Sequence, residues 1–80
     1  MRLPRNISGS ELAQALKVLG YRFTRQRGSH MRYTTETGGQ HHVAIPAHDP
    51  LRIGTFHGIL KDVATHHSLT VEELVERLEL

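Results

Sequence analysis

Apolar residues near the start of the chain recur at the spacing of an α-helix. They share one face of the expected helix: Leu12, Ala15, Leu16 and Leu19. Serine is favourable just before a helix, because its hydroxyl accepts a hydrogen bond from a free N–H group of the first turn. Ser8 and Ser10 are both candidates for this N-cap position, and Gly20 is a typical stop. The pattern therefore predicts a first helix that ends at Gly20.

From residue 21 the pattern changes to the alternation that is typical of β-strands. Aromatic and β-branched residues fall in three runs, 21–27, 30–35 and 41–45, which are separated by short turns that contain glycine. Runs of this kind predict an antiparallel meander of three strands. Successive side chains of a strand point to opposite faces of the sheet. One face should therefore pack against the helices through Tyr21, Phe23, Met31, Tyr33, Val43 and Ile45.

The opposite face of the predicted sheet is polar and basic. Alternation assigns to it Arg22, Thr24, Gln26, His30, Arg32, Thr34, His42 and Ala44. The same rule turns Arg25 and Arg27 toward the helices, where an unpaired charge is unfavourable. We therefore expect these two arginines to lie at the rim of the sheet, or a bulge near Gly28 to interrupt the alternation.

Two further helices are predicted after the strands. Pro46 ends the third strand, and a loop over residues 47–53 leads to Gly54-Thr55, where Thr55 is the preferred cap of the second helix and Gly54 the alternative. That helix has an apolar face and ends at His66-His67-Ser68; the face consists of Phe56, Ile59, Leu60 and Val63. Thr70 and Glu73 have the spacing of a capping box. They begin a short third helix, over residues 70–80, whose apolar residues are Leu74, Val75, Leu78 and Leu80. The expected fold is α+β, in the order α-β-β-β-α plus this C-terminal helix.

The length of the chain limits what it can enclose. Eighty residues form a single domain over residues 1–80 with one small core, so a functional site should lie on the surface. No apolar run approaches the roughly 18 residues that span a bilayer. We therefore expect a cytoplasmic protein that makes no contact with a membrane.

Positive charge is concentrated in the N-terminal part of the chain. Residues 1–34 carry a net charge of +6, and residues 35–80 carry −4. The basic groups of the first part are Arg2, Arg5, Lys17, Arg22, Arg25, Arg27 and Arg32. A basic half next to an acidic half indicates a surface that binds a polyanion such as nucleic acid. A mixed, solvated surface without a ligand is the alternative interpretation.

The histidines do not form a recognisable metal-binding pattern. Cysteine is absent, and nothing resembles His-Glu-x-x-His. His41 and His42 are neighbours on a strand, so they point to opposite faces, and His66-His67 have no third ligand close by in the sequence. We therefore expect neither a metal site nor a cofactor.

Four short segments of the chain form a recognisable series, namely Arg-Gln-Arg-Gly-Ser-His at 25–30, Tyr33, Pro-x-His at 46–48 and Gly-Thr-x-x-x-Ile-Leu-Lys at 54–61. Together they resemble the HicA family of toxins from bacterial toxin–antitoxin pairs. Each falls in the expected order and element, and the similarity covers about residues 8–64. It implies a double-stranded-RNA-binding-like fold and a metal-independent ribonuclease that cleaves mRNA. It further implies that His30 is the catalytic residue and that a HicB antitoxin masks the site.

The residues around His30 suit this chemistry. RNA carries its own nucleophile, the 2′-OH, and an imidazole can act as general base or general acid near neutral pH. The nearest cations for a phosphate group are Arg22, Arg25, Arg27 and Arg32. Gly28 permits a tight turn and a close approach of a phosphate, and Ser29 can donate a hydrogen bond. His48, in the Pro-x-His segment, either assists the site or fixes the loop.

Two other functional classes are compatible with the sequence. A non-catalytic module of the same fold would bind duplex RNA through its shape and backbone. Domains of that kind usually carry a lysine-rich patch on the second helix, whereas here that helix has Lys61 next to Asp62. This difference favours the enzyme. The third class is a protein that only docks onto a partner.

Overall fold

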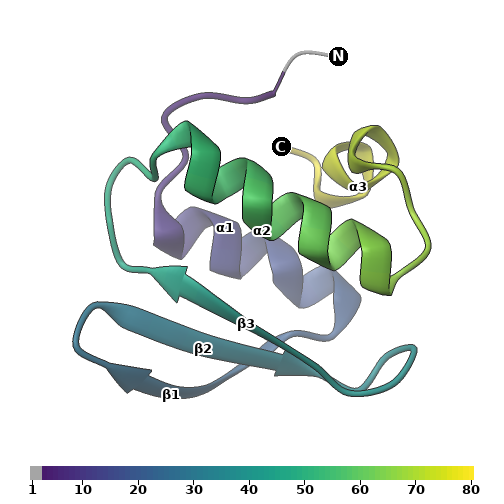
Figure 1. The fold of residues 1–80 in the computed structure, drawn as a ribbon, viewed down its shortest axis with the longest axis horizontal. Helices are drawn as coiled ribbons and strands as arrows, with labels where there is room; N and C mark the ends of the chain where they lie inside the picture. The colour runs from purple at the N-terminus through teal and green to yellow at the C-terminus, as the bar shows by residue number, and fades with distance from the viewer. Residues whose placement is uncertain (1–2) are drawn as a thin grey trace.

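The computed structural model describes residues 3–80, so Arg2, one of the predicted basic residues, lies outside the described part. The elements are α1 (Gly9–Leu16), a 3₁₀ turn η1 (Lys17–Leu19), β1 (Arg22–Arg27), β2 (His30–Thr35), β3 (His41–Pro46), α2 (Ile53–His66) and α3 (Val71–Leu78). Helices α1 and α2 lie on one face of the sheet, and the chain turns back after α2 so that α3 packs against α2 (Figure 1). The predicted α+β fold with an α-β-β-β-α order and a C-terminal helix is confirmed.

Side-chain caps define where α1 and α3 begin. Ser8 and Glu11 form a reciprocal capping box, in which the Glu11 N–H donates to the Ser8 hydroxyl at 3.0 Å and the Ser8 N–H donates to the Glu11 carboxylate at 2.9 Å. Thr70 and Glu73 repeat this arrangement at the start of α3. Gly20 ends the first helical segment with a φ of 84°. The sequence placed these three boundaries correctly because they depend on local contacts.

The start of α2 differs from the prediction. The helix begins at Ile53, and its N-cap is Arg52, which makes no capping hydrogen bond through its side chain. Gly54 and Thr55 both lie within the first turn, so the prediction that one of them is the cap was wrong. The predicted end is correct, since α2 stops at His66. Within residues 3–80, no helix is long and apolar enough to cross a bilayer.

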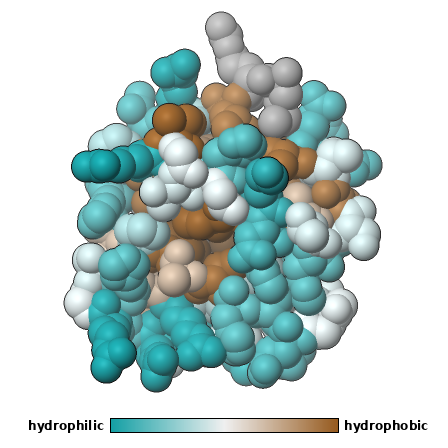
Figure 2. All heavy atoms as spheres, viewed as in Figure 1, coloured by the Kyte–Doolittle hydropathy of each residue, from teal (hydrophilic) through white to brown (hydrophobic). Residues whose placement is uncertain are grey.

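The core lies between the two long helices and the inner face of the sheet. Figure 2 shows apolar atoms between α2 and the sheet, and hydrophilic residues over the end where β1 turns into β2. The largest fully buried apolar side chains are Leu12, Leu16, Tyr21, Ile45, Phe56, Leu60, Val63 and Leu74. Both α1 and α2 contact β3, whereas every residue of β1 is exposed. The sheet is therefore covered on its β3 side and open along β1.

One predicted core position was wrong because the helices cover the sheet unevenly. Phe23 is 52% exposed, although alternation had placed it against the helices. It does point to the inner face, opposite Tyr33, and the two rings make an edge-to-face contact with centroids 5.7 Å apart. Because β1 is an edge strand beyond the reach of the helices, the inner face there meets solvent.

A β-bulge at Thr24 decides which side chains of β1 face outward. Phe23 pairs with Tyr33 and Arg25 pairs with Arg32, so β1 has one residue more than its partner between these pairs. The extra residue reverses the alternation that follows it. Arg25 and Arg27 consequently join the outer face, and Gln26 moves to the inner side. Of the two arrangements expected for these arginines, the structure has the bulge, but it lies at Thr24, four residues before Gly28.

Candidate active site

The outer face of the sheet contains an open hollow of 320 Å³. Its lining residues come from all three strands and are Arg25, Arg27, His30, Met31, Arg32, His42, Val43 and Ala44. The antiparallel register explains this composition. Arg27 pairs with His30 and His30 pairs with Pro46, while Arg25 pairs with Arg32 and Arg32 pairs with Ala44. Side chains of paired residues share a face, so the hollow combines two histidines, His30 and His42, with three guanidinium groups.

His30 is the first residue of β2 and is exposed to solvent. The turn that precedes it consists of Gly28 and Ser29. Gly28 has a φ of 58°, a left-handed conformation that glycine adopts without strain. The Gln26 side-chain amide donates to the Gly28 carbonyl at 2.9 Å, and the Ala47 N–H donates to the Ser29 carbonyl at 2.6 Å. The turn is therefore fixed on both sides, and it presents the His30 imidazole at the edge of the hollow.

The loop after β3, which carries His48, connects this turn to the start of α1. The Gly9 N–H donates to the His48 carbonyl at 2.9 Å, which connects the first turn of α1 to the loop after β3. A Cβ atom at Gly9 would overlap the carbonyl oxygen of Pro46, the residue that pairs with His30. The backbone of His48 thus has a positioning role, and its exposed side chain is outside the set that lines the hollow.

The predicted site residues are only partly brought together. Arg25, Arg27, His30 and Arg32 line one hollow, and Gly28 and Ser29 form the turn beside it. Arg22 pairs with Thr34, toward the opposite end of β2 from His30, and is outside the hollow's lining. Three arginines around a solvent-exposed imidazole form a site suited to an anion, because guanidinium groups bind phosphate in a bidentate manner.

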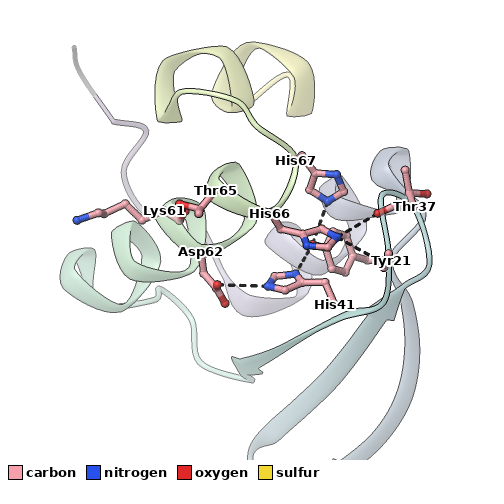
Figure 3. Close-up of polar contacts among 9 residues, drawn as sticks. Tyr21, Thr37, His41, Lys61, Asp62, Thr65, His66 and His67 are labelled. Carbon is pink, nitrogen blue, oxygen red and sulfur yellow. Dashed lines mark hydrogen bonds and ion pairs between the residues drawn. The ribbon is translucent and has the colours of Figure 1, made fainter.

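A second polar cluster lies on the other side of the sheet. The Tyr21 hydroxyl is 2.6 Å from His41 Nδ1 and 3.1 Å from His67 Nε2, and His41 Nε2 is 3.2 Å from an Asp62 carboxylate oxygen (Figure 3). The His66 ring stacks on His41 with centroids 4.4 Å apart. His66 Nε2 also donates to the backbone carbonyls of the turn between β2 and β3. This histidine cluster joins the end of α2 to the sheet.

The environment of the cluster changes two pKa values. Burial of the phenol, together with the Asp62 carboxylate, raises the pKa of Tyr21 to about 12. Burial lowers the pKa of His67, and positive charge on the neighbouring His66, His41 and Arg77 lowers it further. Both shifts favour the neutral forms of these groups.

The sequence did not predict the histidine cluster. Its members come from β3, from the end of α2 and from the residue before β1, so only the tertiary fold brings His41 to His66 and His67. The ring nitrogens that face one another are already engaged in hydrogen bonds. Within residues 3–80, no group of three or more histidine, cysteine or acidic residues has a geometry that would hold a metal ion.

Comparison with known proteins places the chain in a family. The family described as "HicA toxin of bacterial toxin-antitoxin" matches residues 9–64, from the first residue of α1 almost to the end of α2. Searches of curated proteins and of solved structures gave no match. The family match covers well over half of the 80 residues, includes the whole hollow and ends before α3. The chain belongs to the HicA toxin family of bacterial toxin–antitoxin systems.

Proposed function

We propose that this toxin is a metal-independent endoribonuclease that cleaves mRNA in the cytoplasm, with His30 as its catalytic residue. One observation carries the proposal: the bulge at Thr24 turns Arg25 and Arg27 toward the exposed His30, so that an imidazole and three guanidinium groups line one hollow. A proton-transfer group surrounded by phosphate-binding groups is what cleavage of a phosphodiester requires. The family match supplies the biological context of a toxin.

The proposed reaction uses the 2′-OH of the RNA as nucleophile. The 2′ oxygen attacks the adjacent phosphorus, a new P–O2′ bond forms, and the P–O5′ bond breaks. His30 either accepts the proton of the 2′-OH or donates one to the leaving 5′ oxygen, and water performs the other transfer. The products are a 2′,3′-cyclic phosphate and a 5′-OH. Arg27 and Arg32 stabilise the negative charge that builds up on the phosphorane oxygens.

The partner of the toxin follows from its family. A toxin of a toxin–antitoxin pair must be silenced in its own cell, and the basic hollow is a suitable target for an acidic surface. We propose that a HicB-like antitoxin covers His30 and the arginines around it. A mapped complex that left the hollow open while cleavage was blocked would contradict inhibition by masking.

The proposal is tested by replacing His30 with alanine. His30 is exposed, so the substitution creates no cavity and should change stability by no more than about 0.5 kcal/mol. Loss of a general acid or base should reduce the cleavage rate by about 10²- to 10⁴-fold. Arg27→Ala is the companion variant and should weaken RNA binding in a salt-dependent manner. It should also lower, without abolishing, the cleavage rate at saturating RNA, because His30 is still present.

The two measurements are thermal unfolding and cleavage of a labelled RNA. A His30→Ala protein that melts like the wild type and cleaves at the wild-type rate would show that His30 is not the catalyst. If the wild type bound RNA tightly and cleaved none, the protein would instead be a non-catalytic RNA-binding module of the same fold.

A further inference from the structure

A second histidine, His42, lines the same hollow as His30, and the proposed reaction does not use it. His42 is exposed on β3, opposite Thr34, and Ala44 lies opposite Arg32 between the two histidines. Ala44 carries only a methyl group, so the floor of the hollow stays open from one histidine to the other. The guanidinium groups of Arg25 and Arg32 lie along this floor. The hollow therefore has an imidazole toward each end and arginine side chains between them.

The His42 ring is held in a defined orientation. Its Nδ1 atom is 2.8 Å from the hydroxyl of Thr34, a residue that is only 3% exposed. Thr34 in turn lies 3.5 Å from the hydroxyl of Thr24, which donates to the Arg32 carbonyl at 3.0 Å. The bulge residue is thus part of the network that orients His42. Because Nδ1 is bound to Thr34, Nε2 is the ring nitrogen that remains for a ligand.

The separation of the two histidines decides what His42 can do. His30 and Thr34, the residue opposite His42, are four residues apart on β2, which corresponds to about 13 Å along the strand. A stacked nucleic-acid strand advances only about 3.4 Å per nucleotide. With the His42 ring held at Thr34, we therefore expect the two imidazoles to contact different nucleotides. A strand lying along the hollow would meet His42 several nucleotides from the bond that His30 attacks.

We propose that His42 forms a second nucleotide-binding subsite, which binds the RNA substrate on one side of the cleaved bond. The subsite binds through hydrogen bonding or stacking of the His42 ring, and the adjacent arginines contribute charge. This inference rests on the proposed ribonuclease function and assigns His42 to substrate binding rather than to chemistry. It makes substrate length important, because a dinucleotide at His30 is too short to reach His42.

The first test compares cleavage of oligoribonucleotides of increasing length by wild type and His42→Ala. For the wild type, kcat/KM should increase from the dinucleotide to the dodecanucleotide. With the dodecanucleotide, the kcat/KM of His42→Ala should be about tenfold lower than that of the wild type, which is the effect of losing one stacking contact. The dinucleotide should be cleaved equally by both. His57→Ala, which removes an exposed histidine of α2 outside the hollow, is the matched control and should behave like the wild type. An equal loss at every length would overturn the subsite, and so would no loss at any length.

The second test measures binding without cleavage. In a His30→Ala background, addition of His42→Ala should raise the Kd for a fluorescent dodecanucleotide about tenfold. Thr34→Val keeps the shape of the side chain and removes the hydrogen bond to His42, so it should produce part of this loss. An unchanged Kd would refute the subsite even if the wild type is a ribonuclease. A raised Kd in a protein whose wild type cleaves no RNA would support the subsite and refute the proposed nuclease.

Discussion

The Tyr21 hydroxyl connects the sheet to the end of α2, and its removal should measurably destabilise the protein. Tyr21 is 2% exposed, and its oxygen makes the hydrogen bonds of 2.6 Å to His41 and 3.1 Å to His67. Tyr21→Phe keeps the ring and its packing and removes only this oxygen. The variant thus isolates the contribution of the two hydrogen bonds.

The expected loss follows from those two bonds. An intramolecular hydrogen bond contributes about 1 kcal/mol to stability, so two bonds correspond to about 2 kcal/mol. His41 and His67 are partly exposed, and water can replace the missing partner to some extent, which keeps the loss near this value. In a domain of this size each kcal/mol lowers Tm by about 4–8 °C. Tyr21→Phe should therefore melt about 8–16 °C below the wild type.

The assay is thermal unfolding followed by circular dichroism near neutral pH, with Tyr33→Phe as the control. Tyr33 is half-buried, and no hydrogen bond of its hydroxyl is present among residues 3–80. The same chemical change at Tyr33 should shift stability by less than about 0.5 kcal/mol. Equal melting temperatures for the two variants would refute the structural role of the histidine cluster. Tyr21 lies outside the hollow, so folded Tyr21→Phe protein should retain RNA cleavage.

Three further outcomes are expected. Burial lowers the pKa of His67 in the folded protein, so the unfolded chain binds a proton first as the pH falls below about 6.5. Tm should therefore decrease on acidification from that pH, and the decrease should be less steep in His67→Gln. In chemical denaturation, Gly9→Ala should lower the free energy of unfolding by about 1–3 kcal/mol, because the added Cβ overlaps the Pro46 carbonyl. Gly58→Ala, at an open position of α2, should raise the free energy of unfolding by up to about 1 kcal/mol. RNA cleavage should persist in excess chelator, and a loss that a divalent ion restores would refute the acid–base mechanism.

Local sequence signals were sufficient for most of the secondary structure. The capping boxes at Ser8–Glu11 and Thr70–Glu73 and the left-handed stop at Gly20 depend on residues within a few positions of one another. Alternation likewise placed His30, Arg32 and His42 on one face of the sheet, because β2 and β3 pair without an irregularity. The start of α2 could not be read in this way, since no side chain caps it.

Tertiary structure decided the features that give the site its composition. The bulge at Thr24 depends on how β1 pairs with β2, and it turns Arg25 and Arg27 to the side of His30. Phe23 is exposed because the helices cover β3 and leave β1 open, which depends on packing rather than on the pattern of β1. The sequence by itself thus determined the order of elements and the catalytic candidate. Strand pairing and helix packing, which join residues far apart in the chain, determined which cations surround it and which histidines meet on the other side of the sheet.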